Sequence, residues 1–149
     1  MSPWCPSCDY VNGNSLIFKF IPMTKTAIPS LRRHAFERQQ GRCCYCGLPM
    51  WEADPERFAA RYAISARLAA LLRCTAEHVV AQRDGGRHHP RNIVAACAFC
   101  NSRRHKGRAE SAPSAENYRR HVQRRIATGR WHPAVALLLS PVDGGSLNE

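Results

Sequence analysis

Four cysteines arranged as two matched pairs are the side chains in this sequence best spaced to bind a metal ion. Cys43 and Cys46 form one C-x2-C pair, and Cys97 and Cys100 form a second pair later in the chain. Two thiolates spaced in this way reach one ion from a tight turn or a helix start, and two pairs complete the tetrahedral four-sulfur site that binds structural Zn2+. The sequence therefore predicts one structural zinc, whose binding is part of folding.

The other cysteines fit this site less well. Cys44 could take the place of Cys43 in a C-x-C register, but the C-x2-C spacing favours Cys43. Cys74 is interpreted as a buried apolar thiol, a common fate of a free cysteine. Cys5 and Cys8 form a C-x2-C pair that has no second pair to match it. We therefore assign no metal to this early pair.

A second group of polar residues lies between the cysteine pairs and just after them. Hydrolysis of a phosphodiester bond needs a base that activates water and a cation that stabilises charge on the phosphate and on the leaving oxygen. His78 is the candidate base, because an imidazole with an ordinary pKa of about 6.5 can accept a proton near pH 7. Glu77 and Asn101 offer carboxylate and amide oxygens, which suit Mg2+ or Mn2+.

The adjacency of Glu77 and His78 sets a geometric condition on this chemistry. Consecutive side chains of a strand point to opposite faces, so both residues can serve one phosphate only at a bulge or an irregular strand end. His105 lies one helical turn beyond Asn101 and is a candidate to face the same ion or phosphate. The structural alternatives are a packing or surface role for His78, a turn cap for Asn92, and loop positions for His88 and His89.

Short helices and strands are expected to position these residues. Apolar spacing, capping residues and glycine stops predict helices at residues 31–40, 56–72, 98–106 and about 114–129. Runs with β-branched residues predict strands at residues 75–82 and 92–96, and Arg83-Asp-Gly-Gly86 is the turn after the first strand. Strand, loop, strand and helix outline a ββα unit. The predicted fold class is therefore α+β, with a small zinc-stapled ββα core and flanking α-helices.

The stretch from Cys43 to about Lys106 resembles the HNH endonuclease family, whose fold is the ββα-metal or His-Me finger fold. The matching elements are Glu77-His78, Gly85-Gly86, Asn92 and Cys97-x2-Cys100-Asn101, framed by Cys43-x2-Cys46. The resemblance implies a metal-dependent endonuclease that hydrolyses phosphodiester bonds in DNA. It implies that His78 is the general base and that Asn92 orients its ring. It also implies that Glu77 and Asn101 hold the catalytic Mg2+ or Mn2+, which stabilises the departing 3′ oxygen.

Two positions depart from the pattern that is commoner in this family. The family more often has Asp before its first His, where this chain has Glu77, and His at the position of Asn101. Glu is longer by one methylene, and Asn offers an amide in place of a ring nitrogen, so both departures bear on metal preference and affinity. Variants of this kind occur among active members, so the expectation of activity stands.

The resemblance and the expected elements divide the chain into three regions. Residues 1–28 form an irregular lead-in, within which Met23 is an alternative start. Residues 29–108 form the HNH nuclease domain with its structural zinc. Residues 109–149 carry a basic helix and a tail.

An excess of basic residues predicts a polyanionic partner. The chain has 22 Lys and Arg against 11 Asp and Glu, for a formal net charge of +11, and such a balance favours nucleic acid. DNA is the expected partner and RNA is the alternative. The predicted phosphate-binding residues are Arg103, Arg104, His105 and Lys106, with Arg104 expected nearest the scissile phosphate because the family often carries Lys there.

The remaining expectations concern compartment, assembly and the rival function. The first residues show no secretory signal, and the apolar runs at residues 15–21 and 134–139 fall short of the roughly 20 residues that a membrane span needs. We expect a soluble cytoplasmic protein that acts alone, as a homodimer or with a protein partner. The alternative function is a non-catalytic zinc-ribbon module that binds nucleic acid. Glu77, His78, Asn92 and Asn101 favour the nuclease, since pure binding does not need them.

Overall fold

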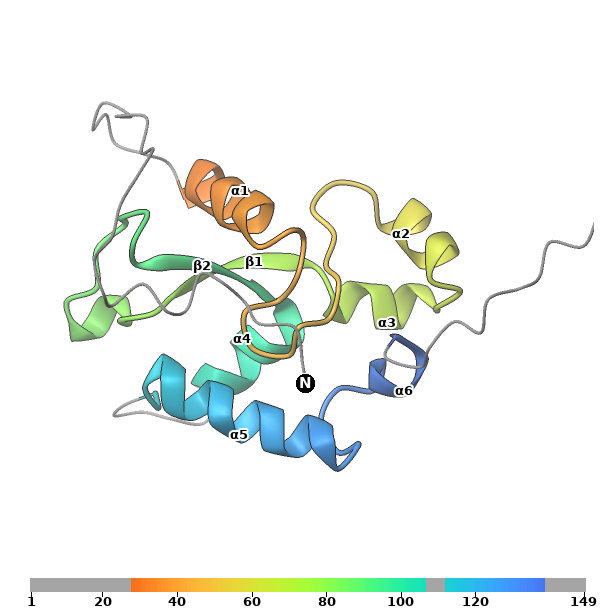
Figure 1. Cartoon of the computed structure of the whole chain (residues 1–149). Helices are drawn as coiled ribbons and strands as arrows, with labels where there is room; N and C mark the ends of the chain where they lie inside the picture. Colours follow the sequence, from red (N-terminus) through yellow and green to blue (C-terminus); the bar gives the residue numbers. More distant parts are fainter. Residues whose placement is uncertain (1–27, 107–111, 139–149) are drawn as a thin grey trace, which may run out of the picture.

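The computed structural model describes residues 28–106 and 112–138. A two-stranded antiparallel sheet lies at the centre, with α1 on one side and α4 on the other (Figure 1). The elements are, in order, α1 (Ile28–Arg38), α2 (Pro55–Arg61), α3 (Ala66–Leu71), β1 (Cys74–His78), a 3-10 turn (Gln82–Asp84), β2 (Ile93–Cys97), α4 (Ala98–His105), α5 (Ala115–Ala127) and α6 (Val135–Leu138).

The predicted ββα unit is present, and the fold class is α+β as expected. β1 pairs with β2 from Cys74 opposite Cys97 to His78 opposite Ile93. α4 follows β2 without a loop, and Cys97 caps it by accepting a hydrogen bond at its sulfur from the backbone N–H of Cys100, at 3.4 Å. The last residue of the strand is therefore also the first residue of the helix cap, which fixes the angle between the two elements.

The prediction of one long helix over residues 56–72 was wrong, because the chain forms two helices there. Asp54 caps α2 and Ser65 caps α3, each accepting a hydrogen bond at its side chain from a backbone N–H three residues on. Between the helices, Ala63 adopts a left-handed conformation with φ of 49°. In one straight helix, Ile64 would lie about 120° from Phe58 around the axis. The break allows both side chains to be buried.

β1 ends at His78, four residues before the predicted strand end. The following loop folds tightly back on itself, and the two glycines make that possible. Gly85 has φ of +85°, and a Cβ on Gly86 would lie 1.8 Å from the carbonyl oxygen of Val80. The backbone N–H of Gly86 donates to the carbonyl of Ala81 at 3.0 Å. Residues with side chains are disfavoured at both positions, the first by its conformation and the second by the close approach of backbone.

A side chain pairs with the backbone N–H and C=O groups at the outer edge of β2. Gln39 follows α1 and is only 4% exposed. Its amide nitrogen donates to the carbonyl of Ala95 at 2.8 Å, and its amide oxygen accepts from the N–H of Ala95 at 2.9 Å. The same nitrogen donates to the carbonyl of Arg42 at 2.8 Å. One amide therefore joins the end of α1, the middle of β2 and the start of the first cysteine turn.

One apolar core runs through all the described elements that flank the sheet. It includes Leu48 from the first cysteine turn, Leu72 from the end of α3 and Ala96 from β2. Val122 of α5 and Val135 of α6 belong to the same cluster. The basic helix α5 therefore packs one face against the core while its cations lie on the other. Within residues 28–106 and 112–138, no helix combines the length and apolar character needed to cross a membrane.

We predict that Gln39→Met lowers the free energy of unfolding by about 1–3 kcal/mol. Methionine has a similar size, but it leaves the buried N–H of Ala95 without a partner. The measurement is urea denaturation followed by circular dichroism. Gln40→Met is the matched control, since Gln40 is exposed, and we expect it to stay within about 0.5 kcal/mol of the parent protein. Equal unfolding free energies for the two variants would contradict the role given to Gln39.

Candidate functional site

The four predicted cysteine ligands lie together in the interior. The sulfurs of Cys43, Cys46, Cys97 and Cys100 all lie within 4.8 Å of one another, and all four residues are buried. The Sγ atoms of Cys46 and Cys97 are 3.8 Å apart. Four sulfurs bound tetrahedrally to Zn2+ at about 2.3 Å lie about 3.8 Å from each other. The sulfur group therefore has the composition and the spacing of a zinc site.

Backbone and side-chain N–H groups converge on these sulfurs. The N–H of Cys97 donates to Sγ of Cys43 at 3.3 Å, and the indole N–H of Trp131 donates to Sγ of Cys100 at 3.3 Å. Such donors favour thiolate sulfur, which is the form that binds metal. Cys44 is buried outside this group of four, with its backbone N–H on the carbonyl of Ala95 at 3.0 Å.

Of the remaining cysteines, Cys74 belongs to the described residues. Cys74 is buried, and burial raises its pKa to about 12, which keeps the thiol protonated. This is the environment expected for an apolar thiol outside the metal group. Cys5 and Cys8 lie outside the described residues.

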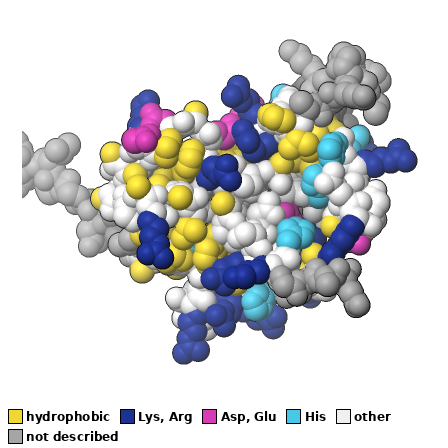
Figure 2. Space-filling view, turned by 180° about the vertical axis from the view of Figure 1, so that it is seen from behind, with side chains coloured by type: hydrophobic (Ala, Val, Ile, Leu, Met, Phe, Trp, Pro, Cys, Tyr) yellow, Lys and Arg dark blue, Asp and Glu magenta, His cyan; other side chains and the backbone are white. Residues whose placement is uncertain are grey.

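A cavity of about 390 Å³ lies beside the carboxyl end of β1. Residues from three elements line it: Glu77 and His78 from β1, Gln82 and Arg83 from the loop, and Asn101 and His105 from α4. Several histidine side chains gather on this face, as Figure 2 shows. The structure therefore brings the predicted base and both predicted oxygen ligands of the catalytic ion to one cavity.

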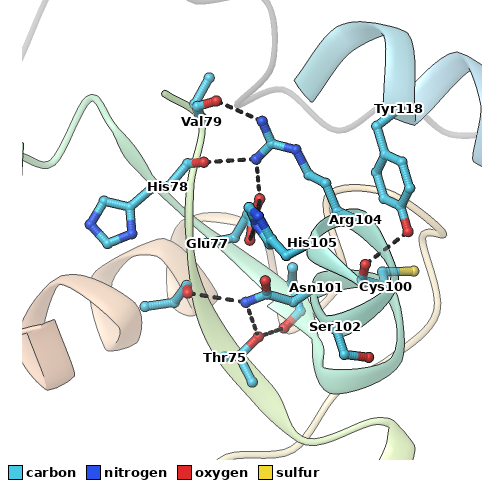
Figure 3. A network of polar contacts seen from close by, with 12 residues as sticks. Thr75, Glu77, His78, Val79, Cys100, Asn101, Ser102, Arg104, His105 and Tyr118 are labelled. Atoms are coloured by element: carbon cyan, nitrogen blue, oxygen red, sulfur yellow. Dashed lines mark hydrogen bonds and ion pairs between the residues drawn. The ribbon is translucent and has the colours of Figure 1, made fainter. Parts of the chain in front are cut away.

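Glu77 is buried at the inner wall of this cavity, with 1% of its side chain exposed. Its Oε1 accepts a hydrogen bond from the hydroxyl of Tyr45 at 3.0 Å. The same oxygen accepts one from Nη1 of Arg104, as Figure 3 shows. Burial raises the pKa of Tyr45, so its hydroxyl remains a proton donor. A buried carboxylate needs partners of this kind, because an unpaired charge in the interior is strongly unfavourable.

The prediction that Arg104 contacts the substrate phosphate was wrong. Only 2% of its side chain is exposed, and its guanidinium is engaged inside the protein. Beyond Glu77, it donates to the carbonyls of His78 at 2.8 Å and Val79 at 2.9 Å (Figure 3). It also donates to the carbonyl of Pro113 at 3.1 Å. Arg104 therefore holds the end of β1 against α4 and compensates the charge of Glu77. The neighbouring basic residues in the sequence did not indicate that the Arg104 side chain points into the interior.

His105 and Asn101 complete the group around Glu77. Nε2 of His105 lies 3.3 Å from both carboxylate oxygens of Glu77. The amide nitrogen of Asn101 donates to Oγ1 of Thr75 at 3.0 Å and to the carbonyl of Ala76 at 3.2 Å. Its amide oxygen is therefore left on the side of Glu77 and His105, as Figure 3 shows.

These three side chains fit a divalent ion such as Mg2+ or Mn2+. Adjacent ligands in an octahedral shell at about 2.1 Å from the ion lie about 3 Å apart, close to the 3.3 Å between Glu77 and His105. Carboxylate, amide oxygen and imidazole are all donors that Mn2+ accepts, and the oxygens also suit Mg2+. The sequence predicted that His105 contacts the phosphate or the ion. Its position beside Glu77 favours the role of an ion ligand.

The ring of His78 points to the other side of β1 from Glu77, as strand alternation requires (Figure 3). The pairing of β1 with β2 is regular up to His78, so no bulge occurs there, and both residues line the cavity at the end of the strand. The His78 and His88 rings lie 5.2 Å apart. Burial, His88 and His105 lower the pKa of His78, although Glu77 opposes the shift. His78 is therefore neutral at pH 7, the form that can accept a proton.

Asn92 holds the loop after β1. Its amide oxygen accepts from the N–H of Val80 at 2.8 Å, and its amide nitrogen donates to the carbonyls of Val80 at 3.1 Å and Arg87 at 3.0 Å. Among the described residues, these bonds go to the backbone and none goes to the His78 ring, which corrects the orienting role implied by resemblance. Asn92 can therefore influence His78 only indirectly, by holding the backbone of the loop that follows it.

Three of the predicted phosphate contacts are exposed, and three other residues join the site. Arg103 and His105 are exposed on α4, and Lys106 is exposed just after it. The first unpredicted residue is Tyr45, which donates to Glu77. The other two are Gln82, which lines the cavity, and His88, which contacts the Gln82 side chain. Tyr45 lies inside the first cysteine pair, but nothing in that spacing points to Glu77. His88 was interpreted as a loop residue, and only the fold of that loop brings it near His78.

The comparisons with known proteins agree with this arrangement. Residues 66–107 match the family model of the HNH endonucleases. That segment holds α3, β1, β2 and α4, and with them Glu77, His78, Asn92 and Asn101. Neither a search of curated proteins nor a search of solved structures finds a match. The segment of residues 66–107 thus matches an HNH endonuclease domain.

Proposed function

We propose that this protein is a metal-dependent endonuclease that hydrolyses phosphodiester bonds in DNA, with His78 as the general base. The observation that carries the proposal is the cavity of about 390 Å³ at the end of β1. It is lined both by a histidine whose pKa is lowered and by three donors suited to a divalent ion. Such a combination of a proton acceptor and an ion site is what phosphodiester hydrolysis requires.

Glu77, Asn101 and His105 would hold the catalytic Mg2+ or Mn2+. When bound, such an ion stabilises negative charge on the phosphate and on the departing 3′ oxygen. Arg104 forms an ion pair with Glu77 and compensates its charge. The three proposed ion ligands and Arg104 together therefore carry no net negative charge. We therefore expect weak ion binding by the free protein and stronger binding once the anionic substrate is present.

His78 would take a proton from the attacking water. Its ring is neutral because burial and the neighbouring histidines lower its pKa. Its Nε2 is buried and has no hydrogen-bond partner among the described residues, so no neighbour fixes the ring by a hydrogen bond at that atom. Asn92 and the Gly85-Gly86 turn supply the fixed loop that borders the ring.

The four-cysteine group would bind Zn2+ as a structural ion. Cys100 is a sulfur donor of the group, and Asn101 is the next residue of α4. A metal that fixes this first helical turn therefore also fixes the amide oxygen offered to the catalytic ion. We place the protein in the cytoplasm, where the thiols stay reduced and available to metal.

A non-catalytic nucleic-acid-binding module is the second candidate. The observation that favours it is the pairing of Arg104 with Glu77, which removes the net negative charge that would attract a divalent ion. Exposed cations on α4 and α5 serve both candidates equally. The two differ in what happens to bound DNA when Mg2+ or Mn2+ is added.

We predict that Cys97→Ser removes most of the zinc, which should otherwise be about one ion per chain. The melting temperature should fall as well, because zinc binding contributes to folding. Zinc is measured by mass spectrometry of the purified protein and melting by circular dichroism. Cys74→Ser is the matched control, since Cys74 is buried but lies outside the four-sulfur group. A Cys97→Ser protein with full zinc and an unchanged melting temperature would overturn the assignment.

We also predict that the protein nicks or cuts plasmid DNA with Mg2+ or Mn2+, and that His78→Ala slows cleavage by about 10²- to 10⁴-fold. Zinc content should stay unchanged, because His78 lies outside the four-sulfur group. His34→Ala, on the exposed side of α1, is the control and should cleave like the parent. Equal cleavage by the His78 and His34 variants would refute His78 as the base. Binding without cleavage in either metal would favour the second candidate.

A further inference from the structure

α4 separates two cavities. Residues of an α-helix are about 100° apart around the axis, so Asn101 and His105 share one side while Arg103, two residues from each, faces the opposite side. On that opposite side, α4 and α5 enclose a second cavity of about 430 Å³. Arg103, Lys106, Asn117, His121 and Trp131 line it. None of these residues lines the cavity that holds His78.

One wall of this second cavity is aromatic and fixed in place. The indole N–H of Trp131 donates to Sγ of Cys100, and the ring meets Tyr118 edge to face with centroids 6.0 Å apart. The hydroxyl of Tyr118 donates to the carbonyl of Cys100 at 2.8 Å. Trp131 is therefore held by the four-sulfur group and by α5 before any ligand arrives, which reduces the entropy lost on binding.

The other wall carries cations that form no ion pair with a carboxylate of the described residues. The guanidinium of Arg103 lies 4.3 Å from the centre of the Phe99 ring and 5.9 Å from that of Trp131. Within residues 28–106 and 112–138, no ion pair involves Arg103, Lys106 or His121. Lys and Arg side chains also gather along the lower edge of the face in Figure 2, where α5 lies. The cavity thus presents unpaired positive charge beside an indole ring.

We propose that this second cavity binds one unpaired nucleotide of the substrate strand, next to the site of cleavage. Its phosphate would contact Arg103 and Lys106, and its base would pack against Trp131. Cations that track the backbone together with an aromatic ring that contacts a base are the features that bind single strands without sequence preference. This inference rests on the proposed endonuclease function and names the part of the substrate that the protein selects.

The size and place of the cavity suit this ligand. A volume of about 430 Å³ lies within the roughly 300–1,000 Å³ range of small-molecule sites. The diameter of an α-helix is about 10 Å, so the two cavities are separated by a distance that a few nucleotides of one strand can span. A base must leave the duplex stack to reach the indole, so the preferred substrates should contain an unpaired segment.

The first test compares two variants that each remove two positive charges. Arg103→Gln/Lys106→Gln alters the cavity, and Arg57→Gln/Arg67→Gln removes exposed cations from α2 and α3. The probe is a fluorescein-labelled single-stranded DNA 20-mer, and binding is followed by anisotropy across salt concentrations without Mg2+ or Mn2+. The cavity variant should bind at least roughly tenfold more weakly, and the slope of log K against log salt should become shallower by about 0.7, for the one phosphate that the two cations contact.

The second test uses Trp131 as the reporter. Stacking of a base should quench the fluorescence of this indole when the unlabelled 20-mer is added, and Trp131→Phe should lose that part of the quenching. Zinc content and melting temperature are measured for Trp131→Phe to confirm that the site is intact. A matched duplex 20-mer should cause less quenching than the single strand. Equal quenching by the duplex, or undiminished quenching in Trp131→Phe, would overturn the proposal.

These outcomes separate the subsite from the catalytic proposal. Binding is measured without divalent metal, so it does not depend on cleavage. If the parent protein cleaves DNA but the two charge variants bind alike, the subsite is refuted while the nuclease stands. If the cavity variant alone loses binding but the parent never cleaves with Mg2+ or Mn2+, the nuclease is refuted and the cavity remains a single-strand binding site.

Discussion

The buried carboxylate of Glu77 is the constraint around which the described structure is organised. A charge with 1% exposure must be neutralised and hydrogen-bonded inside the protein. Its partners come from separate parts of the chain: Tyr45 from the first cysteine turn, and Arg104 and His105 from α4. Arg104 extends the network to the carbonyls of Val79 and Pro113. The one charge therefore ties the cysteine turn, β1, α4 and the approach to α5 into a single arrangement.

A buried ion pair of this kind gives geometry more than net stability. The cost of removing both charges from water offsets much of their attraction, although loss of one partner alone is costly, about 3–5 kcal/mol. Here the pair fixes Glu77 beside Asn101 and places Nη1 of Arg104 on the carbonyl of His78. One guanidinium therefore holds both the carboxylate of Glu77 and the backbone of His78. The same ion pair lowers the affinity of the site for a cation, because Arg104 compensates the negative charge of Glu77.

Local patterns in the sequence predicted the parts of the site that local chemistry determines. The spacing of the two cysteine pairs indicated the four sulfurs, and the β-branched runs and glycine stop indicated β1, β2 and α4. The inward turn of Arg104 was not predictable, because it depends on a carboxylate buried 27 residues away in sequence. The break before Ser65 was hidden by the Ala- and Leu-rich sequence around it, although its capping serine was present. Asn92 was identified as important, but its backbone partners depend on the folded loop.

The sequence of α4 leaves little freedom to change one function without another. Within its eight residues, Cys100 supplies a sulfur, Asn101 and His105 line the cavity beside His78, and Arg104 enters the interior. Arg103 faces the opposite cavity. Since each residue turns the helix by about 100°, inserting or deleting one residue after Cys100 would exchange these faces and place Arg103 or His105 where Arg104 now neutralises Glu77. A deletion would put the imidazole of His105 in place of the guanidinium that pairs with the carboxylate, and an insertion would take Arg103 from the opposite cavity. The helix is constrained in this way because it follows Cys97, one of the four clustered cysteines, without a loop in which a change of register could be absorbed.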